Sequence, residues 1–353
     1  MLNVIEINET NKWDEIVRSF KCYDVFYLNN YSKAFQSYNG GEPILLYYND
    51  GDTRAINVVI KRSIGDIDFY KNITSFSGYI DLITPYGYGG FLVEGNNYKN
   101  INEAYDKFCT ENRVISEFTR FHLFNNYHQY YDGNVESNSH NIVRNLDLSI
   151  DDMLMDFEHK VRKNINKAKQ TGLTIEIDIS GKRINEFLEI YYDTMERNNA
   201  NSGYFFDKKF FDTINEMHDN YVYFHVLYEE KIISTELVLY GSENSYSFLG
   251  GTFSEYFHLR PNDFLKFEII KWAKNKGLKR FVLGGGYGED DGIYRYKKSF
   301  APNGIYDFYV GKKILDRDKY IELTTYRNKR LDLDDYYDTI DTKGFFPKYR
   351  DGI

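Results

Sequence analysis

The sequence predicts an α/β protein made of two related units with mixed, mainly antiparallel sheets. Residues 43–63 and residues 221–241 each have the pattern of a β-hairpin, with runs of β-branched and aromatic residues on either side of a polar turn. In both places the hairpin is followed by another strand-like stretch, a helical stretch and a further strand. Hairpins that lead into a strand, helix and strand are typical of mixed sheets covered by helices. The repeated order favours a duplicated unit over a chance similarity between two hairpins.

The two copies can be followed element by element. The first begins with "EPILLYYNDGDTRAINVVIKR", turns at "NDGD", and continues to a helix at "NINEAYDKFCTENR" and a strand at "VISEFTRFHLF". The second begins with "YVYFHVLYEEKIISTELVLYG", turns at "EEK", and continues to a helix at "PNDFLKFEIIKWAKNKG" and a strand at "LKRFVLGGG".

Between the copies the spacing predicts a helix, a strand and a second helix. Residues 151–172 place apolar side chains at helical spacing, with Gly172 as the C-cap. Residues 173–179 alternate as a half-buried strand whose apolar face is Leu173, Ile175, Ile177 and Ile179. The boundary is expected near residue 150, which gives an N-terminal domain at 1–150 and a C-terminal domain at 151–353.

The composition argues against several classes of protein. The chain has 44 Lys and Arg against 53 Asp and Glu, a formal charge of −9, so it is not expected to coat duplex DNA. Cys22 and Cys109 form no C-x-x-C pair, which fits a reducing cytoplasm. The start of the chain lacks the pattern of a signal peptide, and no apolar run is long enough to span a membrane. We expect a cytoplasmic protein with at most peripheral membrane contact.

Common catalytic motifs are missing from the sequence. Glu289 stands where a dinucleotide fingerprint needs its third glycine, and no G-K-[ST] of a P-loop occurs. The seven histidines form no H-x-x-x-H pair, and there is no G-x-S-x-G motif. We therefore expect no bound metal and no covalent nucleophile.

The strongest candidate site is residues 284–300, "GGGYGEDDGIYRYKKSF". Glycines allow the backbone to approach a ligand closely, and Arg and Lys suit a phosphate or a developing oxyanion. In an extended chain Arg295 and Lys297 would share a face, whereas a helical turn would group Tyr296 with Ser299. In both cases a cation can face a pocket. The glycines expected to contact substrate are Gly284, Gly285 and Gly286.

A second glycine-rich loop is "TPYGYGG" at residues 84–90. Pro85 and the glycines predict a rigid turn from which two tyrosines project as amphipathic contacts. A simple hairpin turn is the alternative to a substrate-facing loop. The residues expected to contact substrate are Tyr86, Gly87, Tyr88 and Gly89.

A concentration of positive charge lies on the helix predicted before residue 172. Lys160, Lys163 and Lys167 are spaced by three and four residues and share a face, with Arg162 on an adjoining stripe. Such a run is often only a solvated helix surface. On an acidic chain it is also the best candidate for contacts with a phosphate-bearing donor.

Several segments together resemble one known family. "VRKNINKAKQTGLTIEI", "YYDTMERNNA" with a later "YFF", "LRPNDFLKFEIIKWAKNKGLKRFVLGGG" and "DGIYRYKKSF" occur in an order and spacing similar to the FemABX-like branch of the Gcn5-related N-acetyltransferase (GNAT) superfamily. "TPYGYGG" is similar to the first-half loop of that family. The resemblance spans roughly residues 25–312.

The resemblance implies two tandem GNAT-like domains and an acyltransferase. Residues 180–220 contain no sustained heptads, so the chain resembles the members without a coiled-coil arm. Lys297 matches the lysine of the family's terminal Phe-Lys pair, which is implicated in catalysis or in binding substrate phosphate; the Phe is Tyr296 here. The stretch "GGTFSEYFHLRPND" lacks the R/Q-x-x-G-x-G/A motif with which acetyl-CoA-dependent relatives hold the pyrophosphate. This difference favours aminoacyl-tRNA over acyl-CoA as the donor.

The family's best-known members transfer an amino acid from aminoacyl-tRNA to the stem-peptide amine of a peptidoglycan precursor, which is nucleotide- or lipid-linked. By resemblance we expect this reaction, with Lys297 as the catalytic residue, Arg295 and Tyr296 at the substrate, and no tightly bound cofactor. Two alternatives stay open. One is acyl-CoA-dependent transfer to a sugar amine of a surface polysaccharide, and the other is a non-catalytic binding module that keeps the double fold.

Overall fold

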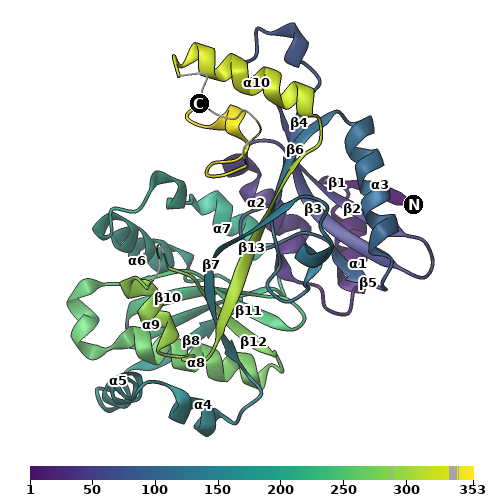
Figure 1. Cartoon of the computed structure of the whole chain (residues 1–353). Helices are drawn as coiled ribbons and strands as arrows, with labels where there is room; N and C mark the ends of the chain where they lie inside the picture. The colour runs from purple at the N-terminus through teal and green to yellow at the C-terminus, as the bar shows by residue number, and fades with distance from the viewer. Residues whose placement is uncertain (287, 289, 334–339, 341) are drawn as a thin grey trace. The chain divides into compact units, whose positions relative to one another are not determined.

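The structure is a computed structural model that describes residues 1–286, 288, 290–333, 340 and 342–353. The chain divides into two compact units (Figure 1). Unit 1 consists of residues 1–20, 26–138 and 308–353, and unit 2 consists of residues 21–25 and 139–307.

Unit 1 contains a mixed sheet with the strand order β1-β2-β3-β4-β6-β13, and β5 pairs with β3. The β4–β6 pair is parallel and is connected by helix α3, whereas β1–β2, β2–β3, β3–β4 and β6–β13 are antiparallel. The elements are β1 (Leu2–Glu6), α1 (Thr10–Ser19), α2 (Asn29–Asn39), β2 (Glu42–Asn49), β3 (Arg54–Ser63), β4 (Ile80–Ile83), β5 (Leu92–Glu94), α3 (Tyr98–Glu111), β6 (Val114–Arg120) and α10 (Arg317–Arg330).

Unit 2 contains a sheet of the same kind, in the order β7-β12-β11-β10-β9-β8. Here β11–β12 is the parallel pair, connected by helix α8, and β7–β12, β10–β11, β9–β10 and β8–β9 are antiparallel. The elements are α4 (Ile150–Asp156), α5 (His159–Gln170), β8 (Thr174–Asp178), α6 (Ile184–Arg197), α7 (Lys208–Asn215), β9 (Tyr221–Tyr228), β10 (Lys231–Tyr240), β11 (Asn244–Thr252), α8 (Pro261–Asn275), β12 (Arg280–Gly284) and α9 (Gly292–Lys298).

The duplication predicted from the sequence is confirmed in the order of the elements. Apart from the short β5 between β4 and α3, unit 1 runs β1-α1-α2-β2-β3-β4-α3-β6, and unit 2 repeats this order as β8-α6-α7-β9-β10-β11-α8-β12. Both predicted hairpins are present, and the second turns through Glu229 and Glu230, which have φ values of 47° and 66°. Residues 180–220, all of them described, hold α6, α7 and the 3-10 helix η4 (Ser202–Tyr204), so a coiled-coil arm is absent from this stretch.

Two long strands explain why the units differ from the domains expected from the sequence. β7 (Asn134–Asn145) pairs with β12 of unit 2 through Val143 and Val282, and β13 (Ile305–Ile314) pairs with β6 of unit 1 through Gly311 and Thr119. The last strand of each sheet therefore comes from the other half of the chain, and it completes the ladder at a strand that would otherwise be an open edge. As a result unit 2 begins at residue 139 rather than 151, and residues 308–353 belong to unit 1 rather than to the C-terminal domain.

The single helix expected at residues 151–172 is two helices, α4 and α5. Phe157 between them is extended, with φ −63° and ψ 152°, and its buried ring packs against Phe267 and Phe300. The N–H of Glu158 donates to the carbonyl of Ser299 at 2.9 Å. These tertiary contacts replace the intrahelical bonds that a continuous helix would have made there.

The core of unit 2 lies between the sheet and the helices α5 and α8 (Figure 1). Helix α6 packs closely on β10 and β11. A Cβ on Gly251 of β11 would lie 2.6 Å from the carbonyl of Ile190, so the helix can approach only because this residue is glycine.

Among the described helices, none has the length and apolar character needed to cross a bilayer. Other short 3-10 helices are η1 (Val25–Tyr27), η2 (Thr74–Phe76), η3 (Tyr127–Tyr130), η5 (Ser254–Leu259) and η6 (Lys348–Arg350).

Candidate active site

The candidate active site lies where β11 and β12 separate. Their parallel ladder runs from the pair Asn244–Arg280 to the pair Tyr246–Val282, although β11 continues to Thr252. Just beyond the last pair, the register between β10 and β11 shifts so that Phe248 is a β-bulge. Bulges re-aim the side chains beside them and are frequent next to active sites.

A buried ion pair lies beside this bulge. Nζ of Lys266, on α8, donates to both carboxylate oxygens of Glu236 on β10 at 2.6 and 2.5 Å, and to Oγ of Ser247 on β11 at 2.6 Å. Both charged side chains are buried. A buried cation is tolerated where its N–H groups are satisfied, and here all three ammonium donors have an acceptor. The pair therefore holds one positive and one negative charge at fixed positions inside unit 2.

Lys297 extends from the short helix α9 toward the end of β12. Its Nζ donates to the carbonyl of Gly285 at 2.6 Å, and among the described residues it has no other hydrogen-bond partner. Burial, together with the ammonium of Lys266, lowers the pKa of Lys297 from 10.5 to about 8. Two of its N–H groups therefore remain available to a ligand.

The glycine-rich turn after β12 packs against groups of the protein itself. Gly284 has φ +84°, and a Cβ there would lie 3.2 Å from Nζ of Lys297. A Cβ on Gly286 would lie 2.6 Å from a carboxylate oxygen of Asp291. Asp291 is the N-cap of α9 and accepts from the N–H of Tyr294 at 2.7 Å and from that of Gly288 at 3.1 Å. Both its oxygens are thus engaged, which leaves it a poor general base.

A pocket of about 550 Å³, which we call the α8 pocket, opens at the N-terminal end of α8. Segments from the start of α5, from η5, from the first turn of α8 and from α9 form its wall. The lining residues are Glu158, Lys160, Val161, Asn164, Phe257, Arg260, Pro261, Asn262, Asp263, Gly292, Arg295, Tyr296 and Ser299. Of the substrate and donor residues predicted from the sequence, Lys160, Arg295 and Tyr296 thus meet in one pocket, and Lys297 is the next residue on α9.

The first turn of α8 is built differently from a diphosphate site. Pro261 has no N–H to offer, and the side chain of Asn262 accepts hydrogen bonds from Ser234 and Thr252. Asp263, which is 9% exposed, places a carboxylate where an anion would bind. Burial raises the pKa of Asp263 above its ordinary value, so neighbouring groups do not fully compensate its charge.

Helix α5 divides the predicted donor-binding residues between two surfaces. Lys160 lines the α8 pocket, whereas Arg162, Lys163 and Lys167 line a separate groove of about 610 Å³. The guanidinium of Arg162 donates to the carbonyl of Met155 at 2.7 Å, so part of its hydrogen-bonding capacity is used within the protein. The exposed ammonium groups of Lys163 and Lys167 form no ion pair with any described residue.

The loop 84–90 belongs to unit 1. The hydroxyl of Tyr31 donates to the carbonyl of Tyr86 at 2.6 Å, and the ring of Tyr86 is 43% exposed. Tyr88 packs edge-to-face against Phe26. Gly87 has φ +94° and lies so close to Phe26 that a Cβ would come within 2.6 Å of its ring. The loop is therefore held by aromatic packing, and Tyr86 is its more accessible side chain.

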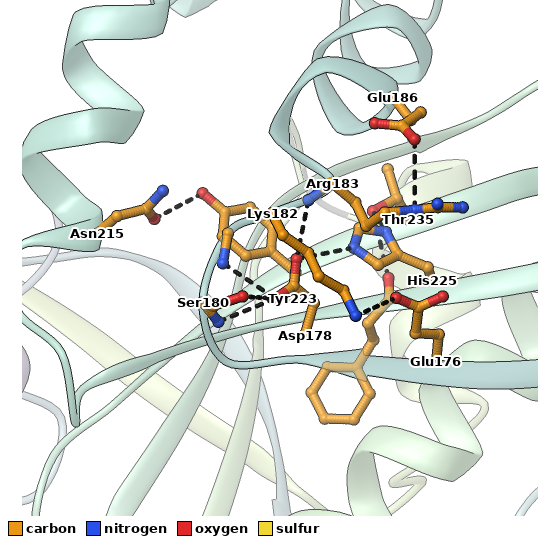
Figure 2. A network of polar contacts seen from close by, with 12 residues as sticks. Glu176, Asp178, Ser180, Lys182, Arg183, Glu186, Asn215, Tyr223, His225 and Thr235 are labelled. Carbon is orange, nitrogen blue, oxygen red and sulfur yellow. Dashed lines mark hydrogen bonds and ion pairs between the residues drawn. The ribbon is translucent and has the colours of Figure 1, made fainter.

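A second polar network of unit 2 lies on β8, β9 and β10 (Figure 2). His225 is 0% exposed, and its Nδ1 lies 2.8 Å from Oγ1 of Thr235 while its Nε2 lies 3.9 Å from Asp178. Asp178 accepts from the N–H groups of Ser180 and Arg183 at 2.9 and 3.0 Å. His225 and Asp178 are thus enclosed, whereas Lys182 and Glu186 at the edge of the network are exposed.

The network reverses part of the pattern predicted for residues 173–179. Asp178 is buried, whereas Ile177 and Ile179 are 44% and 69% exposed. Hydrogen bonds from the following turn compensate the burial of the carboxylate, so the strand can turn its last apolar side chains outward. Among the described residues, no group of three or more His, Cys, Asp or Glu side chains is arranged to hold a metal ion.

Three residues of the candidate site were missed in the sequence analysis. Glu236 interrupts an otherwise apolar strand, and Lys266 interrupts the apolar face of α8, so each carried a local signal. Asp263 lies in the first turn of the same helix, where aspartate is common, so it carried no signal of a site.

Comparisons with known proteins bear on the fold of the chain. Residues 155–298 match the family model described as acetyltransferase (GNAT) domain. The structure is similar to that of FemX, with a TM-score of 0.69 and 15% identity over 90% of this chain and 98% of FemX. No curated protein sequence matches the chain.

Two further structures share the fold. A protein described as a lysylphosphatidylglycerol synthetase from Agrobacterium fabrum has a C-terminal domain with a TM-score of 0.57 and 12% identity, over 86% of this chain and 91% of that domain. A conserved protein of unknown function from Bacteroides thetaiotaomicron has a TM-score of 0.58 and 10% identity, over 88% of this chain and 99% of its own.

The fold and the sequence match together define the class of protein. The chain has a FemABX-like double-GNAT fold, and a GNAT acetyltransferase domain occupies most of unit 2. The GNAT domain at residues 155–298 makes the protein an acyltransferase, and the double-GNAT fold implied by the resemblance is confirmed.

Proposed function

We propose that the protein transfers an amino acid from an aminoacyl-tRNA to an amine of a cell-wall peptidoglycan precursor. The observation that carries the proposal is Lys297, a part-buried ammonium with unused donors on α9, the helix whose Arg295 and Tyr296 line a pocket that lacks the features of a diphosphate site. The FemX-like fold supports the same reaction.

The chemistry asks little of the protein beyond positioning and electrostatics. The neutral acceptor amine attacks the ester carbonyl of the donor, and the new C–N bond creates a tetrahedral oxyanion. Lys297 donates hydrogen bonds to that oxyanion, or to a nearby phosphate, in a site from which water is largely excluded. Collapse of the intermediate breaks the C–O bond, and the amine's proton passes to the departing 3′-oxygen of the tRNA.

The choice of donor rests on the first turn of α8. A CoA pyrophosphate would need free backbone N–H groups and no negative charge there. Pro261 has no N–H, and Asp263 adds a carboxylate. Positive charge lies instead at Lys160, Arg260 and Arg295, around the pocket. We assign these side chains to phosphates near the tRNA 3′ end, and Arg162, Lys163 and Lys167 to phosphates further along the same strand.

For the acceptor, we propose that Tyr86 and Tyr88, with Gly87 and Gly89, contribute the first-half contact loop, with Tyr86 as the accessible ring. In the second half, we propose the turn of Gly284, Gly285 and Gly286 as the acceptor contact. The turn lies close to Lys297, and its glycines have no side chain that would block the acceptor amine. We place the reaction in the cytoplasm, where charged tRNA and nucleotide-linked precursors are available.

A donor screen tests this function. The purified full chain is incubated with a UDP-linked or lipid-linked stem-peptide precursor and either a complete set of charged tRNAs or radiolabelled acetyl-CoA. We expect a labelled amino acid to appear on the precursor amine and ribonuclease treatment of the donor to abolish the transfer. Transfer from acetyl-CoA to a sugar amine, with none from tRNA, would establish the CoA-dependent alternative. Tight ligand binding without turnover from either donor would establish a binding module.

A further inference from the structure

The α8 pocket carries opposite charges at different places. Lys160, Arg260 and Arg295 contribute cations, of which Arg295 also lies 3.6 Å from Asp290. The lining carboxylates are Glu158, which is exposed, and Asp263, which is 9% exposed. Such a pocket complements a ligand with an anionic group at one position and a cationic group at another. A plain acyl thioester has no cation to offer to the carboxylate.

Asp263 has no counter-ion of its own. Among the described residues it forms no ion pair within 4.0 Å, and its carboxylate is stabilised only by the side-chain amide of Asn164, its own backbone N–H and the more distant charges of Arg260 and Lys160. A buried carboxylate without a paired cation is costly, and a ligand cation would remove that cost.

A second unsatisfied group lies beside Asp263. The hydroxyl of Tyr296, which lines the same pocket, is buried and has no hydrogen-bond partner in the described part of the chain. The charges of Asp263 and Glu236 both act on this phenol, so both carboxylates lie near it. Tyr296 directly precedes Lys297 on α9, the helix that carries the proposed catalytic cation.

We propose that Asp263 binds the α-ammonium group of the aminoacyl donor and so makes this chain select donors with a free α-amine. The proposal rests on the proposed function, because it takes the α8 pocket as the donor pocket. Asp263 is a specificity-determining residue in this account. The phenol of Tyr296 donates to an oxygen of the same aminoacyl ester, and the phosphates of the tRNA end lie at Lys160 and Arg260.

The test compares one charged tRNA with the same tRNA after N-acetylation of its amino acid. We expect the wild-type protein to use the free-amine donor at least about tenfold more efficiently, because acetylation leaves the buried carboxylate unpaired. Asp263→Asn should lose most of this preference by slowing only the reaction of the free-amine donor. Glu268→Gln, which removes an acid from the same helix outside the pocket lining, should keep the wild-type preference.

The role of Asp263 and the proposed function can each be overturned separately. Equal use of both donors by the wild type, or an equal loss with both donors in Asp263→Asn, would overturn the role of Asp263 while leaving the transfer reaction intact. If no charged tRNA supports transfer, the proposed function fails. The role of Asp263 is then decided by binding of an adenosine 5′-phosphate that carries a 3′-amide-linked alanine. A less than about threefold difference between its free and N-acetylated forms would overturn the role.

Discussion

Unit 2 buries two groups of ionisable side chains, and they differ in what lies beside them. The first group is Lys297 with the Glu236–Lys266 pair. Tyr296 and Asp263, which line the α8 pocket, are carried by the same two helices as Lys297 and Lys266. His225 and Asp178 lie within the sheet and the turn that follows β8, where Asp178 accepts several hydrogen bonds from the protein and Nδ1 of His225 lies 2.8 Å from Thr235 (Figure 2). Burial lowers the pKa of both basic groups, to about 8 for Lys297 and about 4 for His225.

The comparison teaches that a perturbed pKa alone does not identify an active site. Both groups are desolvated, but Lys297 is only part-buried and keeps unused N–H donors on a helix that borders the α8 pocket, whereas the ring of His225 is fully enclosed. Structural networks shift pKa values as strongly as catalytic ones do. The two cases differ in whether a ligand can reach the basic group. Substitutions of Lys297 and of His225 test this difference.

The largest effect is expected for Lys297→Met. Removing the cation should lower turnover between about tenfold and about a thousandfold, because oxyanion stabilisation is lost. The free energy of unfolding at pH 7 should not fall, because the wild type carries a desolvated ammonium that methionine removes. Turnover and chemical denaturation measure the two effects.

Lys298→Met is the matched control, since it removes a cation from the adjacent position of the same helix. It should keep both turnover and stability close to wild type. Near-normal turnover in Lys297→Met would show that the reaction takes place elsewhere.

A smaller effect, on stability rather than turnover, is expected from His225. Its pKa is about 4 in the folded chain against an ordinary value of 6.5, so the unfolded chain binds a proton first as the pH falls. The folded state should therefore lose up to about 3 kcal/mol as the pH falls to 4, and only about 0.4 kcal/mol of this loss should appear above pH 6.5.

Denaturation at pH 7, 6 and 5 measures this dependence, and His225→Gln should flatten it. The exposed His258 offers a control, because His258→Gln should leave the slope unchanged. Transfer per folded molecule at pH 7 should be the same in His225→Gln as in the wild type. A large loss of turnover in folded His225→Gln would remove the distinction between the two networks.

Much of the fold followed from local patterns in the sequence. The hairpins β2–β3 and β9–β10 and the helices α3 and α8 lie where alternation and helical spacing predicted them. The pairing of β7 and β13 with sheets of the other half of the chain was not predictable. It depends on contacts between residues as distant in sequence as Thr119 and Gly311. The break between α4 and α5 depends in the same way on the contact of Glu158 with Ser299.

The candidate site was predictable in part for a related reason. Lys297, Arg295 and Tyr296 stand in one motif, so a local pattern and a family resemblance could find them. Glu236 and Lys266 become a pair only when α8 packs on β10, and Asp263 becomes unusual only once the pocket surrounds it. These properties arise from tertiary packing and have no counterpart in residue spacing.

The pH dependence of single-turnover transfer tests the central claim most directly. Rates are measured from pH 6 to pH 10 with one charged tRNA and corrected for spontaneous ester hydrolysis. If the Lys297 ammonium stabilises the oxyanion, the wild-type rate should fall above about pH 8, and Lys297→Arg should move that fall to higher pH. A wild-type rate that rises steadily through pH 9 would contradict the account.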